Sequence, residues 1–149
     1  MENVIKESLR LYPLATNGAS RKCTRSTTIC GYEIEKGVTV QADTFTVHHS
    51  RELWGEDADQ FNPDRWDSNE VRHPTAWFPF GGGPRMCIGM RLAYMEQKIG
   101  LIHILRKYDI VRREDSEKEL ELVGSLVVQP RRVTVGLRSR TGREAENTL

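Results

Sequence analysis

Residues 77–89 have the sequence WFPFGGGPRMCIG, and the rest of the chain is organised around this stretch. Three consecutive glycines and a neighbouring proline disfavour both helix and strand, which predicts a loop. Apolar residues recur at helical spacing directly behind it and predict a helix that runs to about Tyr108. They are Ile88, Leu92, Met95, Ile99 and Ile102. Cys87 is therefore expected where a glycine-rich loop enters a helix, and the apolar stripe of that helix is expected to pack in a core.

Cys87 is the residue of this stretch that can carry chemistry. The unpaired N–H groups and the positive dipole end at a helix start both favour the thiolate form. A nucleophilic thiolate needs a histidine base within reach, and the loop contains none. A lone thiolate framed by amides suits an axial haem ligand, because the porphyrin supplies four nitrogens. The alternative is an inert cysteine in a surface loop, which is common for a free thiol.

The loop resembles the haem-binding signature of the cytochrome P450 family, Phe-x-x-Gly-x-Arg-x-Cys-x-Gly. The signature positions are matched without a gap by Phe80, Gly83, Arg85, Cys87 and Gly89. The resemblance implies that Cys87 is the proximal thiolate ligand of haem b and that Arg85 binds a haem propionate. It also implies that Gly89 lets the backbone approach the porphyrin. Electron donation from such a thiolate favours cleavage of the O–O bond.

The first residues, Met1 to Leu11, form a predicted helix that ends before Pro13. Its expected inward face comprises Val4, Ile5, Ser8, Leu9 and Tyr12. Glu7 and Arg10 lie three positions apart on one face, a pattern that is equally typical of a surface ion pair of little energetic value.

Two further segments favour a structural role for Glu7 and Arg10 over an ordinary surface ion pair. Residues 7–13 resemble the family's Glu-x-x-Arg helix, and residues 61–66 resemble its Phe-x-Pro-x-Arg segment, with Arg65 at the arginine position. The resemblance implies a buried triad of Glu7, Arg10 and Arg65. Such a triad would support the haem pocket without taking part in catalysis, and an arginine fork would give it bidentate geometry.

Two other residues are candidates for binding haem propionates by resemblance. Arg21 falls where many members place such an arginine, and a solvated charge is an equal alternative. His48 begins His48-His49-Ser50-Arg51, in place of the family's usual His-Arg-Asp-Pro, and fits a histidine near a propionate. Adjacent histidines point apart, so we do not expect His48 and His49 to share a metal ion. We expect their side chains to be solvated. Residues 14–20 are expected to line the distal side of the haem and touch substrate, although they also fit a plain loop.

Short strands complete the expected fold. Residues 27–42 alternate and contain β-branched side chains, which predicts a small antiparallel sheet with a turn at Glu35–Gly37. Candidate strands near the C-terminus are 122–123, 126–128 and 133–135, and the turn at 124–126 resembles the family's last substrate-contacting loop. The expected class is mainly α with small β-sheets (α+β), the C-terminal part of the cytochrome P450 fold without its distal helices.

The composition of the chain limits which binding partners and cellular compartments are expected. A net charge of +1 over 149 residues argues against a nucleic-acid partner held by bulk electrostatics. Cys23, Cys30 and Cys87 have no metal-type spacing and cannot all pair with one another, which indicates a reducing compartment. No stretch approaches the roughly 20 apolar residues of a membrane span.

The resemblance runs from Val4 to about Ser139. It divides the chain into residues 1–139, the C-terminal haem-binding part of a cytochrome P450 domain, and a polar tail, residues 140–149. Family members carry a membrane anchor, most of their helices and the distal proton-delivery pair before the Glu-x-x-Arg helix. We expect no catalytic residue of that kind in this chain, which we interpret as a fragment. Its sequence most resembles the animal microsomal members of the family.

The implied activity is that of a haem-thiolate monooxygenase, which hydroxylates lipophilic small molecules with O2 and electrons from NADPH. A reductase docking on the cysteine side would deliver those electrons. Full-length members of this branch are expected on the cytoplasmic side of the endoplasmic reticulum membrane, held through an N-terminal anchor that we do not expect in these 149 residues. The alternative is a non-catalytic remnant that binds haem weakly or serves as an interaction fragment. The chain alone is expected not to be a working monooxygenase.

Overall fold

The computed structural model describes residues 1–16, 19–67, 71–125 and 127–140. Its helical elements are α1 (Glu2–Leu11), α2 (Thr44–His48), α3 (Arg51–Trp54), the 3-10 turns η1 (Pro63–Trp66) and η2 (Gly83–Arg85), and α4 (Met90–Lys107). Its strands are β1 (Ser20–Lys22), β2 (Thr27–Ile29), β3 (Tyr32–Ile34), β4 (Thr39–Gln41), β5 (Tyr108–Val111), β6 (Leu122–Val123), β7 (Gln129–Pro130) and β8 (Gly136–Ser139). These strands pair in separate two-stranded antiparallel sheets. The predicted α+β class is confirmed.

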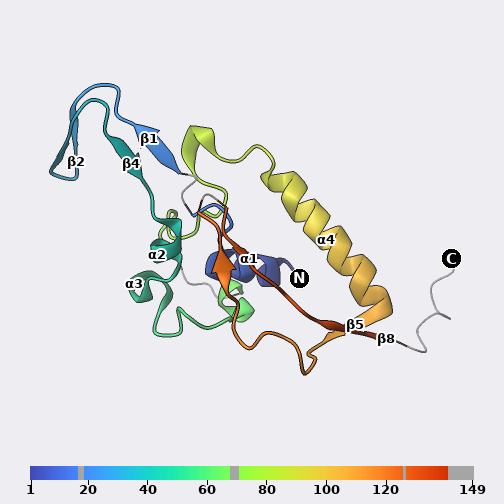
Figure 1. Ribbon diagram of the computed structural model, residues 1–149. Coiled ribbons are helices and arrows are strands. Elements are labelled where there is room, and N and C mark those ends of the chain that lie inside the picture. The colour runs from blue at the N-terminus through green and yellow to red at the C-terminus, as the bar shows by residue number, and fades with distance from the viewer. Residues whose placement is uncertain (17–18, 68–70, 126, 141–149) are drawn as a thin grey trace.

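Helix α1 lies at the centre of the molecule, between the sheet arm and α4 (Figure 1). It packs against η1, α2 and α4, and its buried face includes the apolar residues Ile5, Leu9 and Leu11. The predicted inward face was partly wrong, because Val4 and Tyr12 are 41% and 40% exposed. Two charged side chains, those of Glu7 and Arg10, are buried on α1 at positions that the predicted inward face did not include.

The sheets between residues 20 and 41 form an arm that extends away from α1 (Figure 1). Strand β2 pairs with β3 through a tight turn at Cys30 and Gly31, and β4 pairs with β1. The turn predicted at Glu35–Gly37 does have a positive φ at Gly37, of 98°. It does not join paired neighbours, however, because β4 finds its partner in β1, a strand that the sequence pattern did not predict.

A small aromatic core lies beside α1. Trp54, Ala58 and Ala76 are buried, and Trp66 and Trp77 pack against them. The ring centroids of Trp66 lie 5.5 Å from those of Trp54 and 5.4 Å from those of Trp77. The core therefore holds the first residue of the 77–89 loop against η1 and α3.

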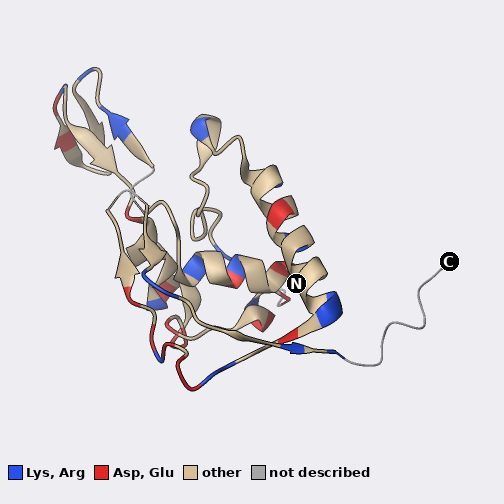
Figure 2. Cartoon of the chain, turned by 45° about the vertical axis from the view of Figure 1, so that its right-hand side comes forward, with Lys and Arg blue, Asp and Glu red and all other residues tan. Residues whose placement is uncertain are grey.

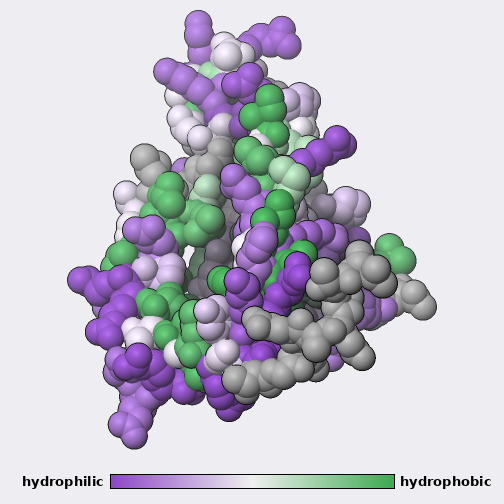
Figure 3. Space-filling view, turned by 90° about the vertical axis from the view of Figure 1, so that its right-hand side faces the viewer, coloured by the Kyte–Doolittle hydropathy of each residue, from purple (hydrophilic) through white to green (hydrophobic). Residues whose placement is uncertain are grey.

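Helix α4 begins at Met90, three residues after Cys87, which is later than the apolar pattern predicted. Its predicted packing in a core is wrong for the described chain, because Leu92, Met95, Ile99 and Ile102 are between 43% and 53% exposed. The main described neighbours of α4 are α1 and β5, and neither covers this apolar stripe. Apolar side chains interrupt the polar surface on this side of the molecule (Figure 3), and charged residues are interspersed along α4 (Figure 2).

The C-terminal strands only partly match the prediction. Strand β8 pairs with β5, while residues 133–135 lie outside any strand. Val127 and Val128 also lie outside the strands, and Leu126 lies outside the described residues, as does the tail at 141–149. The Val128 N–H donates to the Leu14 carbonyl oxygen at 2.7 Å, so the residues that follow the predicted 124–126 turn lie beside Leu14. None of the helices in the described part of the chain combines the length and apolar character needed to cross a bilayer.

Candidate functional site

Glu7, Arg10 and Arg65 meet in one buried cluster, which we call the arginine cluster. One turn of α1 separates Glu7 from Arg10, so their side chains project from the same face toward η1. Arg10 donates from Nε to Glu7 Oε2 at 3.0 Å and from Nη2 to Glu7 Oε1 at 2.9 Å. Arg65 Nε donates to the same Oε1 at 3.0 Å. Glu7 and Arg10 are 0% exposed, so this pair differs from an ordinary surface ion pair.

Every N–H of the two guanidinium groups has an acceptor. A guanidinium carries five N–H donors. Those of Arg10 that do not bind Glu7 donate to the carbonyl oxygens of His48, Ala58 and Gln60, at 2.8, 2.6 and 3.1 Å. The remaining donors of Arg65 bind the carbonyl oxygens of Trp54 and Asp57 and both carboxylate oxygens of Asp57. The cluster thus ties α1 to the last residues of α2 and α3 and to the segment that follows α3.

The electrostatics of Glu7 follow from these contacts. Burial acts to raise its pKa, but hydrogen bonds from Arg10, the Asn62 N–H and Arg65 outweigh burial and hold the pKa below its usual value. The Trp66 indole N–H donates to Glu7 Oε2, which also accepts from Arg10 Nε, at 3.0 Å. Glu7 therefore stays ionised inside the fold.

His48 also belongs to this buried region, which corrects two expectations. It was expected near a haem propionate and among solvated histidines, yet its ring is 0% exposed and absent from the cavity of Cys87. Its Nε2 accepts the Phe78 N–H at 3.0 Å, and its Nδ1 lies 3.2 Å from the Arg10 carbonyl oxygen. Burial lowers the pKa of His48 to about 4, so the ring is neutral near pH 7 and is not a cation for a carboxylate.

The loop that carries Cys87 is held by its own backbone. The Gly81 N–H donates to the Phe78 carbonyl oxygen and the Cys87 N–H to that of Phe80, both at 2.9 Å. Gly83 has a φ of 69°, a left-handed conformation that favours glycine. The Cys87 thiol is exposed and free, and a Cβ built on Gly89 would lie 3.8 Å from its sulfur. That distance is ordinary contact, so the role expected for Gly89 stays a prediction.

Cys87 opens into a cavity of about 430 Å³. Leu9, Leu14, Pro79 and Phe80 give this cavity apolar walls, and Arg21 and Arg85 line it together with the thiol. Arg21 donates to the Ser20 carbonyl oxygen, and no carboxylate in the described ranges forms a salt bridge with either arginine. Gly83 lines instead a neighbouring cavity of about 560 Å³, whose lining includes Met86 and Met90 but neither arginine.

This donor set fits a haem. A haem needs one strong axial donor, an apolar surround and cationic partners for its propionates, and the cavity offers a thiol, apolar walls and two guanidinium groups. A Cβ built on Gly81 or Gly82 meets no atom within 4 Å, so this wall leaves open space. No three His, Cys, Asp or Glu side chains form a metal-binding group within the described residues.

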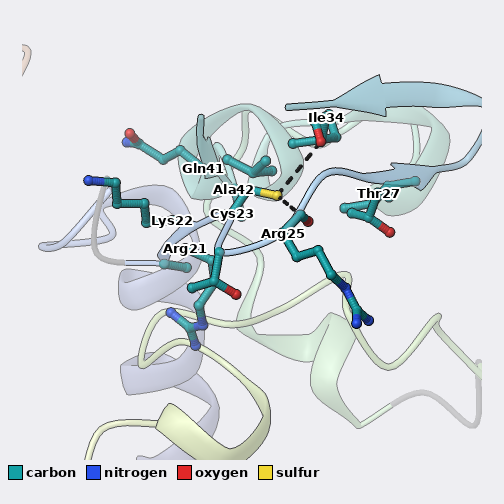
Figure 4. Close-up of a pocket in the computed structure, with 12 residues that line it drawn as sticks. Arg21, Lys22, Cys23, Arg25, Thr27, Ile34, Gln41 and Ala42 are labelled. Atoms are coloured by element: carbon teal, nitrogen blue, oxygen red, sulfur yellow. Dashed lines mark hydrogen bonds between the residues drawn. The ribbon is translucent and has the colours of Figure 1, made fainter. Parts of the chain in front are cut away.

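Cys23 provides a comparison within the same chain. It lines a separate, open cavity of about 770 Å³ between the strands of the arm (Figure 4). Its sulfur lies 3.0 Å from the Arg25 carbonyl oxygen and 3.7 Å from that of Ile34, so it acts as a thiol donor. Arg21 lines both cavities, and in Figure 4 its side chain points away from that of Lys22.

Several residues of the site were missed by the sequence interpretation. Asp57 binds Arg65, and Trp66 and the Asn62 N–H bind Glu7. The Asn62-Pro63-Asp64 sequence signals a turn, and Asn62 does cap η1 by accepting the Asp64 N–H. This signal could have placed Arg65 on a short helical turn, but not its partners.

Comparison with known proteins agrees with the geometry. The sequence matches the family description "Cytochrome P450" over residues 1–137. It is 52% identical over 141 residues to cytochrome P450 CYP13A2 of Caenorhabditis elegans. It is 46% identical over 140 residues to cytochrome P450 cyp-13B1 of the same organism. Each alignment covers 94% of this chain, and the chain spans only 27% and 28% of the length of these relatives.

A solved structure gives the same answer. The crystal structure of the cytochrome P450DA heme domain superposes with a TM-score of 0.81 and 31% sequence identity, covering 93% of this chain and 30% of that one. The matched family description covers most of the sequence, and the fold agrees over nearly the whole chain. The chain therefore belongs to the cytochrome P450 family.

Proposed function

We propose that this chain is the proximal, haem-binding part of a haem-thiolate monooxygenase that hydroxylates lipophilic small molecules. The observation that carries the proposal is the meeting of Cys87, Arg21 and Arg85 in one apolar-walled cavity. A single thiolate and two arginines, for which the described part of the chain supplies no salt-bridge partner, form a donor set that matches one haem and its two carboxylates.

Each residue has a distinct part in this proposal. Cys87 would hold the haem iron through its thiolate, and Arg85 and Arg21 would bind the propionates. When bound, the haem supplies the iron that activates dioxygen, and thiolate donation favours O–O cleavage. Phe80 and the aliphatic wall, including Leu9 and Leu14, exclude water from that side of the cavity.

The arginine cluster supports the site from behind. Glu7, Arg10 and Arg65 fix α1 against η1, and Leu9 on the same helix lines the cavity. We assign the cluster a structural role, because its buried donors and acceptors are already satisfied and none of its three residues lines the cavity. A change in the cluster would therefore act on the cavity through the position of α1.

The rest of the activity concerns a complete enzyme. Electrons would come from NADPH through a reductase that docks on the cysteine side, and the substrate would be a lipophilic small molecule. The endoplasmic reticulum membrane would be the location of a full-length member of this branch. These proposals rest on membership of the family. They concern a complete enzyme because the relatives CYP13A2 and cyp-13B1 are more than three times longer than the part of them that this chain matches.

One observation favours a second candidate. The apolar stripe of α4 is exposed in this chain, as is Cys87 itself. A large exposed apolar patch is typical of an interaction surface. The alternative is thus a non-catalytic polypeptide that binds haem weakly and associates with another protein through α4.

The test uses a chimera in which this chain replaces the matching segment of the C. elegans relative CYP13A2. The ferrous carbon monoxide spectrum is recorded for the parent chimera, for Cys87→Ser and for the control Cys23→Ser. We expect a thiolate-type Soret band in the parent and in the control, and its loss in Cys87→Ser. A thiolate-type band that survives Cys87→Ser would contradict the proposal.

A further inference from the structure

His48 lies between the arginine cluster and the loop that carries Cys87. It is the last residue of α2, and it is fully buried. Two of its contacts go to Arg10: the Arg10 Nη1 donates to the His48 carbonyl oxygen at 2.8 Å, and the His48 Nδ1 lies 3.2 Å from the Arg10 carbonyl oxygen. The residue is therefore fixed to α1 by both its backbone and its ring.

The other edge of the ring faces the loop. The Phe78 N–H donates to His48 Nε2 at 3.0 Å, and the two rings meet edge to face with centroids 5.4 Å apart. Since Nε2 accepts a hydrogen bond, the neutral ring carries its hydrogen on Nδ1 and donates to Arg10. One ring thus uses both nitrogens, in opposite senses, to join two segments that are 68 residues apart at Arg10 and Phe78.

Phe78 anchors the first hydrogen bond within the cysteine loop. Its carbonyl oxygen accepts the Gly81 N–H, and two residues further on the Phe80 carbonyl oxygen accepts the Cys87 N–H. A displacement of Phe78 would therefore shift the acceptor that orients the Cys87 backbone. Within the described residues, His48 is the only side chain that accepts the Phe78 N–H.

We infer that His48 is a positioning residue that couples the arginine cluster to the cysteine loop and thereby sets the orientation of Cys87. This inference rests on the proposed function for its effect on a bound haem. Its effect on the loop is independent of haem. The two parts can therefore be tested separately, with one pair of matched variants.

The variants separate the two hydrogen bonds of the ring. In His48→Gln the side-chain amide oxygen can reach the place of Nε2 and accept the Phe78 N–H. In His48→Asn the shorter side chain keeps a donor for the Arg10 carbonyl oxygen but does not reach Phe78. Both variants lose the aromatic ring, so they share the loss of packing. His49→Asn is the control, because the neighbouring His49 ring lies against Phe45 and not against the loop.

The first measurement is hydrogen exchange at the Phe78 amide in the 149-residue chain. We expect slow exchange in the parent, in His49→Asn and in His48→Gln, and exchange faster by at least tenfold in His48→Asn. The β5–β8 amides report whether the fold is retained. Equal exchange at Phe78 in folded His48→Asn and in the parent would overturn the inference.

A second measurement needs no variant. Nitrogen NMR of the histidine ring distinguishes the two neutral tautomers, and we expect the hydrogen of His48 on Nδ1. A hydrogen on Nε2 would overturn the inference even if His48→Asn failed to fold, because that nitrogen could not then accept the Phe78 N–H.

The third measurement connects the loop to the haem. In the chimera with CYP13A2, His48→Asn is expected to lower the ratio of thiolate-type to thiol-type ferrous carbon monoxide absorbance several-fold, while His48→Gln retains the parent ratio. An unchanged ratio in His48→Asn would contradict the effect on Cys87. A parent chimera without any thiolate-type band would instead defeat the proposed function, and the exchange at Phe78 would still decide the role of His48.

Discussion

Arg65 and Glu7 stand 58 positions apart in the sequence, yet Arg65 Nε lies 3.0 Å from Glu7 Oε1. Their side chains are 5% and 0% exposed. This contact joins the first helix to η1 and, through Arg10, to the backbone beside α2. The arrangement leads to predictions about stability, pH dependence, backbone conformation and activity.

Replacing Arg10 by lysine should lower the free energy of unfolding by about 3–5 kcal/mol, because lysine leaves buried charge and carbonyl oxygens without partners. Lysine has three N–H donors, and the guanidinium uses five. Urea unfolding of the chain measures the effect. Arg51→Lys is the control, since that side chain is 63% exposed and its exchange should cost less than about 1 kcal/mol. Equal unfolding midpoints for Arg10→Lys and the parent would show that the cluster does not stabilise the fold.

Acidification should destabilise the chain between about pH 6.5 and pH 4 through His48. Its pKa is lowered from 6.5 to about 4 in the folded chain, so the unfolded chain binds the proton more tightly and stability falls as pH drops through this window. The neighbouring Arg10 and His49 charges act in the same direction. The loss amounts to about 3 kcal/mol at the lower end. The lowered pKa of Glu7 adds a further loss only below its usual value of 4.5.

Unfolding by urea at several pH values measures this dependence. His48→Gln should remove most of the slope between pH 6.5 and pH 4.5, because glutamine does not titrate. A slope that is the same in His48→Gln and in the parent would assign the dependence to other groups.

Two adjacent glycines in the cysteine loop should respond differently to alanine. Gly83 has a φ of 69°, so Gly83→Ala should cost about 1–2 kcal/mol of stability. Gly82 has a φ of −151°, which any residue adopts, and a Cβ there meets no atom within 4 Å. Gly82→Ala should therefore be neutral or stabilising by up to about 1 kcal/mol. Thermal unfolding of the two variants measures the difference, and equal costs at both positions would contradict the loop conformation.

The chain alone should bind haem without coupled turnover. Cys87 is exposed, and the apolar stripe of α4 is uncovered, so a haem in this cavity would remain accessible to water. The measurement compares NADPH oxidation with product formation in the presence of haem, a reductase and lipophilic substrates. Substrate-dependent turnover coupled to NADPH oxidation would show that this chain is a complete catalyst.

The sequence singled out those residues of the candidate site that are identified by short spacing. Cys87 and Arg85 lie within one loop, and Glu7 and Arg10 within one helical turn, so the motifs that contain them are local. Their meeting with Arg65 could be expected only by resemblance, because no local rule brings positions 7 and 65 together. The fold class could be predicted for the same reason, since helix and strand periods are local properties.

Contacts over long sequence separations account for what was missed. His48 looked solvated beside His49, and only its partners Arg10 and Phe78, 38 and 30 positions away, explain its burial. Strand β1 was missed because three exposed residues become a strand only by pairing with β4. The inward face of α1 was partly misassigned because a pattern of apolar residues cannot identify charged residues, such as Glu7 and Arg10, that are buried together with their partners.

The complete use of the Arg10 donors has a consequence for the dynamics of the chain. Three carbonyl oxygens and one carboxylate are held at the same guanidinium, so no one of them can leave without exposing others. The segments they belong to, α1, the end of α2 and residues 58–60, should consequently open together in a single cooperative event. Local fluctuations that loosen a single loop would then be rare here, and the surroundings of the cysteine loop would behave as one folding unit anchored at a single side chain.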